Sequence, residues 1–323
     1  MTLEADSLAE RRRLKRRLRF WRVGAILLAV IAIIAIFLSS NGTTLAQLGF
    51  NPHIARVTIA GFISDDRDQR KLLSDIGDNR QVRGVILHIN SPGGTTAGAE
   101  ALYNSLRRLA EKKPVVAVFG TAATSAAYLA GIAADHIVAR GNSITGSVGV
   151  ILQYAEFSEL LHNWGIHVEE VRSGELKAIP SPFTPTDAKG RALIEELVDE
   201  SRNWFVDIVT KRRALKPDVI EQVKTGRIYT GRQAIQIGLV DEIGDEQTAL
   251  KWLQEKRGVP KDIEIIDRKT ESSYSSVLMH SLAAGAGSVF GGPVERILEL
   301  ITEGRHFNQL DGLISLWHPE KPQ

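Results

Sequence analysis

The chain of 323 residues contains no cysteine, which excludes disulfide bonds, thiol catalysis and metal sites built from thiolates. It also lacks a large net charge, and a formal charge of +2 gives no indication of nucleic-acid binding. The eight histidines show neither the spacing of metal ligands nor a triad-like grouping, and neither a phosphate-binding loop nor a complete dinucleotide fingerprint occurs. We therefore expect no metal, no cofactor and no nucleic-acid partner.

The positive charge that is present gathers near the N-terminus. Residues 11–22 contain eight Lys and Arg side chains, and the uncharged apolar stretch 23–38 follows them. With aromatic residues before it and small polar residues after it, this stretch reaches the ~17–25 residues that a membrane-spanning helix needs. The pattern predicts a basic cytoplasmic segment over 1–19 and one transmembrane signal anchor over 20–40.

The flanks of this segment predict its orientation and processing. Basic residues precede the helix, so the positive-inside rule keeps the N-terminus in the cytoplasm and places the rest of the chain outside the inner membrane. A cleaved secretory signal peptide is the rival interpretation. Its cleavage box would be Thr44–Ala46, a weak match. We therefore favour an uncleaved anchor, and a single-pass protein of the bacterial inner membrane with a periplasmic domain.

Strand and helix patterns alternate after a short linker over 41–52. The apolar strand 84–90 suits a buried parallel position, and the turn residues 91–94 are expected to end it. The alternation predicts an α/β fold with a mainly parallel sheet and surrounding helices over 53–268, followed by a helical or mobile tail over 269–323. The expected helices cover 68–76, 96–112, 125–133, 154–164, 186–212, 217–224, 231–237 and 245–256. The expected strands cover 54–63, 84–90, 114–119, 136–139 and 239–240, and 168–171 is expected to be extended.

Ser125 stands where a reactive serine could be presented. It follows the apolar run 115–119 and opens a helix of small residues that includes Ala126, Ala127 and Gly131. The first turn of a helix has free backbone N–H groups, so the Ala126 N–H could stabilise a developing oxyanion. The small side chains leave room for a substrate backbone. The ordinary interpretation of such a serine is a helix cap or a packing residue.

Lys177 lies in the loop 173–182, between Leu176 and Ala178, with few other charges nearby. Burial among these apolar neighbours would lower the pKa of its amine and leave part of it neutral, as a general base must be. Most lysines are instead solvated surface residues. If Lys177 meets Ser125, the chain is a serine hydrolase whose base is a lysine and not a histidine.

Two further segments complete the candidate site. Asn90–Gly94 follows a strand, and its two glycines permit a turn with positive φ whose N–H groups are open to a ligand. Gly94, and Gly93 beside it, could therefore supply a second oxyanion donor. Ser147 precedes another apolar run and is also a candidate, although serine is common in turns.

Five segments together resemble the signal peptide peptidase A family, which comprises membrane-anchored Ser–Lys peptidases related to the Clp protease proteolytic subunit and to the crotonase fold. The resemblance covers about residues 53–260, and the segments follow the family's order. They are Asn90–Gly94, Ala122–Tyr128, Thr145–Val150, Ser173–Lys177 and Gly226–Ala234.

The resemblance implies a role for each matching residue. Ser125 would be the nucleophile and Lys177 the general base. Ser147 would be the serine that binds this lysine and orients it. The oxyanion hole would consist of the N–H groups of Gly94, Gly93 and Ala126.

The resemblance also implies an assembly and a substrate. Family members of this length form ring-shaped homo-oligomers, in which neighbouring subunits complete each site. The implied activity is that of a serine endopeptidase that degrades cleaved signal peptides. The family usually has two glycines after the nucleophile, whereas this chain has Ala126 and Ala127. The added methyl groups narrow the pocket, so this departure concerns substrate preference more than activity.

Other functions are compatible with the sequence. A related membrane Ser–Lys protease would cut a partner membrane protein, such as a stomatin-like protein. A catalytically inactive scaffold is a further alternative. The presence of Ser125, Ser147 and Lys177 argues against it. Acyl-CoA chemistry, common in the wider fold, would leave the serine–lysine pair unexplained. For the tail, the amphipathic segment 294–301 suggests packing against neighbouring subunits or near the active-site groove.

Overall fold

A computed structural model describes residues 20–22, 24, 28, 51–270 and 314–316. The chain divides into two units, Met1–Asn51 and Pro52–Gln323. In the first unit the described residues 20–22, 24 and 28 are helical. Most of the predicted transmembrane segment, and all of the basic segment before it, lie outside the described residues. Among the residues that are described, no helix is long and apolar enough to span a membrane.

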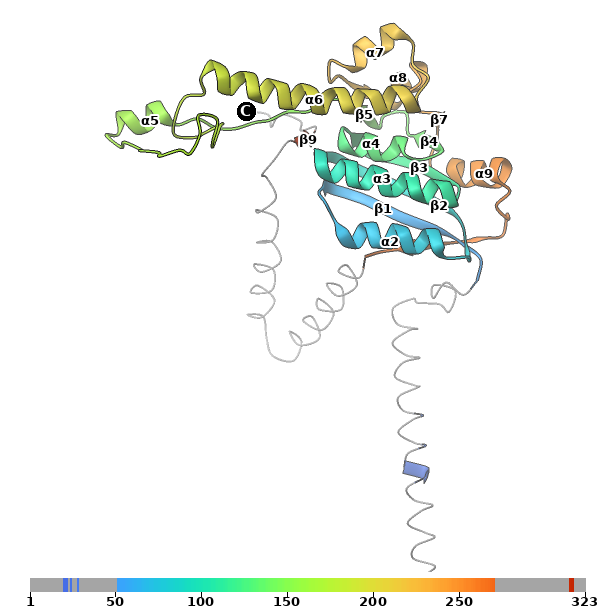
Figure 1. Cartoon of the computed structure of the whole chain (residues 1–323). Coiled ribbons are helices and arrows are strands. Elements are labelled where there is room, and N and C mark those ends of the chain that lie inside the picture. Colours follow the sequence, from blue (N-terminus) through green and yellow to red (C-terminus); the bar gives the residue numbers. More distant parts are fainter. Residues whose placement is uncertain (1–19, 23, 25–27, 29–50, 271–313, 317–323) are drawn as a thin grey trace, which may run out of the picture. The chain divides into compact units, whose positions relative to one another are not determined.

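The second unit is an α/β unit, and its described part forms a nine-stranded, mainly parallel sheet (Figure 1). The path of the sheet is β6-β5-β3-β2-β1-β8, with β4 beside β3, β7 beside β4, and β9 beside β2. Only the β5–β6 and β2–β9 pairs of this described sheet are antiparallel. The strands are β1 (His53–Ile63), β2 (Val82–Thr95), β3 (Val115–Thr124), β4 (His136–Ala139), β5 (Ile144–Gly146), β6 (Ile228–Thr230), β7 (Glu242–Ile243), β8 (Glu264–Arg268) and β9 (Ile314–Leu316).

Helices cover both faces of the sheet. Successive side chains of the central strands belong to cores on opposite faces of the sheet. Val85 and Leu87 of β2 join a large core with most of the helices, whereas Ile86 joins a smaller core with Leu253 of α9 on the other face. This alternation follows from the two-residue period of a strand, and burial on both faces explains the continuous apolar runs. The helices are α2 (Arg67–Asp78), α3 (Thr96–Lys112), α4 (Ala126–Ile132), α5 (Ser158–Asn163), α6 (Ala188–Arg212), α7 (Pro217–Val223), α8 (Gly231–Gln236) and α9 (Glu246–Arg257).

Short polar side chains cap several of these helices. The side chain of Thr95 accepts a hydrogen bond from the N–H of Gly98 at the start of α3, and that of Asp187 accepts from Gly190 at the start of α6. Such caps satisfy donors that have no partner within the helix. The expected helices 96–112 and 186–212 are therefore confirmed, with Asp187 as the cap of the second.

The structure corrects the predicted end of β2. The strand does not stop at Ser91 but continues to Thr95, because its pairing with β1 resumes after a shift in register at Phe62–Gly93 and Ile63–Gly94. Gly93 takes up the irregularity with a φ of 121°, a value that favours glycine. The glycine turn is therefore an irregular strand end that remains part of the sheet.

Several short helices and strands also differ from the expectations. The expected helix 154–164 is reduced to the six residues of α5, and the expected strand 239–240 is wrong. The segment 168–171, expected to be extended, is not part of a strand. The strands β6, β7 and β8 have few residues or mixed composition, so periodicity did not indicate them. The amphipathic segment 294–301 lies outside the described residues.

The segment between β5 and α6 leaves the body of this unit. Figure 1 shows the stretch that carries α5 projecting beyond the end of the sheet, alongside the first half of α6. The buried residues of α6 are Gly190, Phe205, Val206 and Val209, so the helix packs on the core mainly through its C-terminal part. This projecting segment, residues 151–187, includes Lys177.

Candidate active site

Ser125 lies at the junction of β3 and α4, where the sequence predicted a reactive serine. Ser125 is only 1% exposed, and its backbone adopts φ 58° and ψ −120°. A residue other than glycine in such a conformation costs about 1–3 kcal/mol, which the surrounding structure must offset. A hydrogen bond from the Ser125 N–H to the Gly146 carbonyl oxygen, 2.8 Å long, helps to hold it.

Ser147 is placed next to Ser125 by the register of two parallel strands. Thr124 of β3 pairs with Gly146 of β5, and each serine is the residue that follows its member of this pair. Neighbouring strands lie about 4.8 Å apart, so the two serines end adjacent strands side by side. Ser147 also has a positive φ, 53°, and its N–H donates to the Arg227 carbonyl oxygen at 2.9 Å.

The glycine turn lies beside the same strand end. Thr124, the residue before Ser125, donates its side-chain O–H to the carbonyl oxygen of Pro92 at 3.0 Å. The N–H of Gly93 donates to the Ser91 hydroxyl at 3.1 Å, so it already has an intramolecular acceptor. Gly94 lies next to it, opposite Ile63 of β1 and Ser315 of β9.

Gly94 also has a steric reason to be glycine. A Cβ atom at this position would overlap the backbone carbonyl group of Ile63 on β1. No side chain fits without displacing the strand. The close approach of β1 and β2 therefore requires glycine at this point of the site.

Asn90 is a supporting residue to which the sequence gave no role of its own. Its side-chain oxygen accepts hydrogen bonds from the N–H groups of Thr121 (3.0 Å) and Ala122 (3.2 Å) in β3. These donors lie where the β2–β3 pairing shifts between Ile89 and Ser91. A polar side chain at the end of a buried apolar strand was the signal that could have indicated this role.

The helix after Ser125 is held rigidly. All seven residues of α4 are buried, including Ala126 and Ala127. The Tyr128 hydroxyl donates to the Leu239 carbonyl oxygen at 3.0 Å, and burial raises the pKa of Tyr128 above its ordinary value. The phenol therefore stays protonated and acts as a fixed anchor of this helix.

Lys177 is not part of this cluster in the single chain. It lies on the projecting segment between α5 and α6, where it is exposed, and its backbone N–H donates to Gly174. The preceding Leu176 is 44% exposed. The desolvation that we expected from the apolar neighbours is therefore not supplied by this segment. The structure brings Ser125, Ser147 and the glycine turn together and leaves Lys177 on a separate, exposed part of the unit.

An extended segment already lies along the glycine turn. Strand β9 pairs antiparallel with β2, with Leu316 opposite Gly93, Ser315 opposite Gly94 and Ile314 opposite Thr95. The edge of the sheet next to Ser125 is thus able to bind a peptide in extended conformation. Chemically, the arrangement offers a buried serine hydroxyl, backbone donors and a peptide-binding edge, which are the elements of acyl transfer.

The described residues contain no group of three or more His, Asp or Glu side chains that could hold a metal ion.

Two family models match the chain around this site. The model of peptidase family S49 matches residues 107–260, which include both serines and Lys177. The model of Clp protease matches residues 69–141, which include the glycine turn and Ser125. The two matches overlap at the β3–α4 junction.

Known proteins are similar over most of the chain. A protein of Methanocaldococcus jannaschii that is provisionally named a protease is 34% identical over 232 residues, 71% of this chain and 75% of the relative. A similarly named protein of Synechocystis is 32% identical over 211 residues, 65% of this chain and 76% of the relative. A protein of Enterococcus faecium, provisionally named signal peptide peptidase SppA, is 29% identical and covers 78% of each chain.

Proposed function

Because the chain belongs to peptidase family S49 and is a serine peptidase, we propose that it is a membrane-anchored endopeptidase that degrades cleaved signal peptides. In this proposal Ser125 is the nucleophile and Lys177 is the general base. The observation that carries it is the position of Ser125, buried at a strained strand–helix junction beside Ser147 and Gly94.

The proposed reaction follows from these positions. Neutral Lys177 accepts the proton of the Ser125 hydroxyl while the oxygen attacks a peptide carbonyl carbon. The N–H groups of Gly94 and Ala126 stabilise the resulting oxyanion. Lys177 then gives the proton to the leaving amine, and water hydrolyses the acyl-enzyme. Ser147 holds the lysine amine in place during both proton transfers.

We propose that Lys177 reaches Ser125 from a neighbouring copy in a ring-shaped homo-oligomer. Lys177 is exposed in its own chain, and most of the large apolar side chains that are exposed among the described residues lie between 151 and 197. Such a surface is typical of a protein–protein interface. A second copy that covers it would also remove Lys177 from water, as a neutral amine requires. The exposed apolar residues include Phe157, Leu160, Trp164, Ile166, Val171 and Phe183.

A peptide substrate would bind by adding a strand at Gly93–Thr95. The antiparallel pairing of β9 with these residues supports this mode, because backbone hydrogen bonds provide affinity without demanding a particular sequence. A relative of Enterococcus faecium that is provisionally named signal peptide peptidase SppA supports signal peptides as the substrate class.

The proposed location rests on the N-terminal sequence. The basic residues 11–22 followed by the apolar stretch 23–38 support a single anchor in the bacterial inner membrane, with the N-terminus cytoplasmic and the catalytic unit periplasmic.

The test of this function uses the full chain in detergent and a fluorogenic peptide with the sequence of a signal peptide. We expect turnover by the natural chain and none by Ser125→Ala, with both proteins folded and in the same assembly. A folded Ser125→Ala protein that retains turnover would contradict the assignment of the nucleophile. Equal rates on signal peptides and on charged peptides of the same length would contradict the substrate class.

A further inference from the structure

Helix α6 follows the segment that carries Lys177, and its C-terminal end contacts α4, the helix that follows Ser125. It has 25 residues and, at about 1.5 Å per residue, it spans about 37 Å. None of its residues from 191 to 204 is buried, so its firm contacts are near its two ends. A tilt of about 5° at one end would displace the other by about 3 Å, which is enough to misplace a catalytic group.

The C-terminal end of α6 is bound to the end of α4. The Arg212 guanidinium donates to the carbonyl oxygens of Ile132 and Ala134, each at 2.9 Å. Between them, the Ala133 carbonyl oxygen accepts a hydrogen bond from Arg107 of α3 at 2.6 Å. Carbonyl groups at a helix C-terminus have no partner within the helix, so these two cations satisfy them and fix the helix that follows Ser125.

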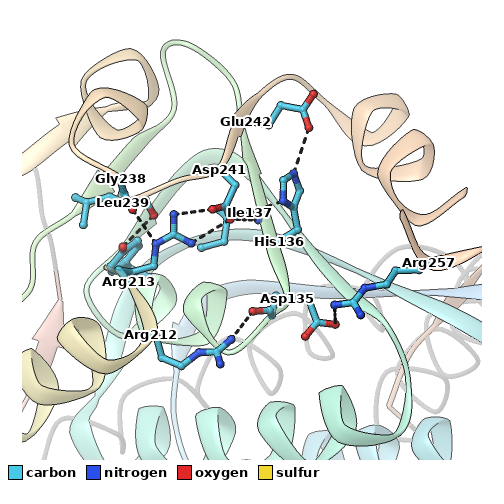
Figure 2. Close-up of polar contacts among 12 residues, drawn as sticks. Asp135, His136, Ile137, Arg212, Arg213, Gly238, Leu239, Asp241, Glu242 and Arg257 are labelled. Atoms are coloured by element: carbon cyan, nitrogen blue, oxygen red, sulfur yellow. Dashed lines mark hydrogen bonds and ion pairs between the residues drawn. The ribbon is translucent and has the colours of Figure 1, made fainter. Parts of the chain in front are cut away.

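The next residue secures the same end of α6 to the sheet. Figure 2 shows the Arg213 guanidinium facing the Asp241 carboxylate, and the two form a bidentate pair of 3.0 and 2.8 Å. Arg213 also donates to the Gly238 carbonyl oxygen, and Asp241 accepts from the Ile137 N–H of β4. Burial alone would lower the pKa of Arg213, but its hydrogen bonds with Asp241 raise it above the ordinary value.

The N-terminal end of α6 is bound to the loop of Lys177 by two contacts. Ile179 packs on the backbone of Gly190, where an added Cβ atom would lie 2.8 Å from the Ile179 Cγ2 atom. Glu175 forms an ion pair of 2.7 Å with Lys189. These two contacts lie two residues after and two residues before Lys177. The lysine therefore lies on a short loop that contacts the first turn of α6 on both sides. The packing of Ile179 on Gly190 is the stronger of the two contacts, since the side chains of Lys189 and Glu175 are 69% and 65% exposed.

We propose that helix α6 sets the position of Lys177, and that Gly190 and Ile179 are positioning residues for this base. The inference rests on the proposed function, because it takes Lys177 as the group that deprotonates Ser125 of a neighbouring copy, so α6 would set where its own subunit presents the lysine to that copy. An added Cβ atom at Gly190 would come nearest to Ile179, with the capping Asp187 Oδ1 atom next at 3.1 Å, and Ile179 transmits the position of the helix to the loop. The contact lies outside the peptide-binding edge, so it acts on the chemical step and not on substrate binding.

The test compares Gly190→Ala, Ile179→Ala and the double variant in the full chain, with steady-state kinetics on the fluorogenic peptide. Gly190→Ala forces Ile179 aside, and we expect kcat to fall by about tenfold or more while KM stays within about twofold. Ile179→Ala removes the side chain that is displaced, so adding it to Gly190→Ala should restore part of kcat. The matched control is Gly77→Ala in α2, where the new methyl group meets only the flexible side chain of Lys112 and Leu109, and kcat should not change.

The outcomes separate this inference from the proposed function. If Lys177→Ala keeps its turnover, the proposed function fails. If Lys177→Ala is inactive but Gly190→Ala retains the natural kcat, only the positioning role is overturned. A lower kcat that Ile179→Ala does not relieve also overturns it, because the loss would then have another origin. If Gly190→Ala does not fold, Ile179→Ala alone decides: an unchanged kcat contradicts the inference and a several-fold lower kcat at constant KM supports it.

Discussion

The backbone N–H of Ser125 donates to the carbonyl oxygen of Gly146, the residue that directly precedes Ser147, at 2.8 Å. This bond joins the ends of two parallel strands, β3 and β5. The two serines that follow both have positive φ, 58° and 53°. A pair of strained residues at adjacent strand ends is typical of a functional site, since strain persists only where the surroundings enforce it.

Ser147→Ala tests the role of the second serine. If Ser147 holds the lysine amine, its removal should lower kcat by about tenfold to a hundredfold and leave KM within about twofold, because peptide binding uses other atoms. Steady-state kinetics on the fluorogenic peptide provide the measurement. Ser74→Ala, an exposed position on α2, serves as the control. An unchanged kcat in folded Ser147→Ala would remove this residue from the mechanism.

Gly94→Ala tests the steric requirement at the oxyanion turn. The new methyl group would overlap the carbonyl of Ile63, so β1 and β2 must separate locally. We expect the free energy of unfolding to fall by about 2 kcal/mol or more, with loss of turnover. Thermal denaturation followed by circular dichroism measures the first effect, with Gly77→Ala as the comparison. A natural melting temperature together with full activity would show that the close approach is unimportant.

Arg213→Met tests the pair that anchors the end of α6. The side chains of Arg213 and Asp241 are 13% and 29% exposed, so removing one partner leaves a largely buried charge. We expect a loss of about 2–4 kcal/mol in the free energy of unfolding. Lys211→Met provides the control, because the nearby Lys211–Asp207 pair is mostly exposed and should contribute less than about 0.5 kcal/mol. Equal effects of the two substitutions would contradict the anchoring role.

A chain that ends after residue 313 tests whether β9 competes with substrate. Removing β9 leaves the Gly93–Thr95 edge open, so KM for peptides should fall severalfold while kcat remains the same. Ser315→Pro in the full chain should act in the same direction, since proline cannot donate a backbone hydrogen bond to the opposite strand. Ser315→Ala is its control. An unchanged KM in both altered chains would show that β9 does not occupy the substrate edge.

The sequence predicted the central elements of the fold well because long periodic segments determine them. The helix α3, of 17 residues, has the predicted bounds, and the α/β pattern with a mainly parallel sheet is confirmed. The end of β2 was not predicted, because glycines that normally end a strand here allow a shift in register. Strands of two or three residues, such as β7, depend on their partners and leave no periodic signal.

The candidate site, like the fold, was predicted only in part from the sequence. Ser125 was indicated by its place between an apolar run and a small-residue helix. Ser147 was also a candidate from the sequence, but its role came only from the resemblance and its position beside Ser125 was not predicted, because strand register is a property of the folded sheet. The exposure of Lys177 was not predicted either, since apolar neighbours in the sequence bury a side chain only if another surface covers them. Asn90 was missed because its partners lie about thirty residues away.

Complementation between two inactive variants tests most directly the claim that Ser125 and Lys177 of neighbouring copies form one site. Ser125→Ala and Lys177→Ala are each inactive in this account. Co-expressed in equal amounts, they should assemble rings in which about a quarter of the sites combine an intact serine with an intact lysine, and turnover should return to that level. Mixed rings, verified by two affinity tags, that show no turnover would contradict the shared site.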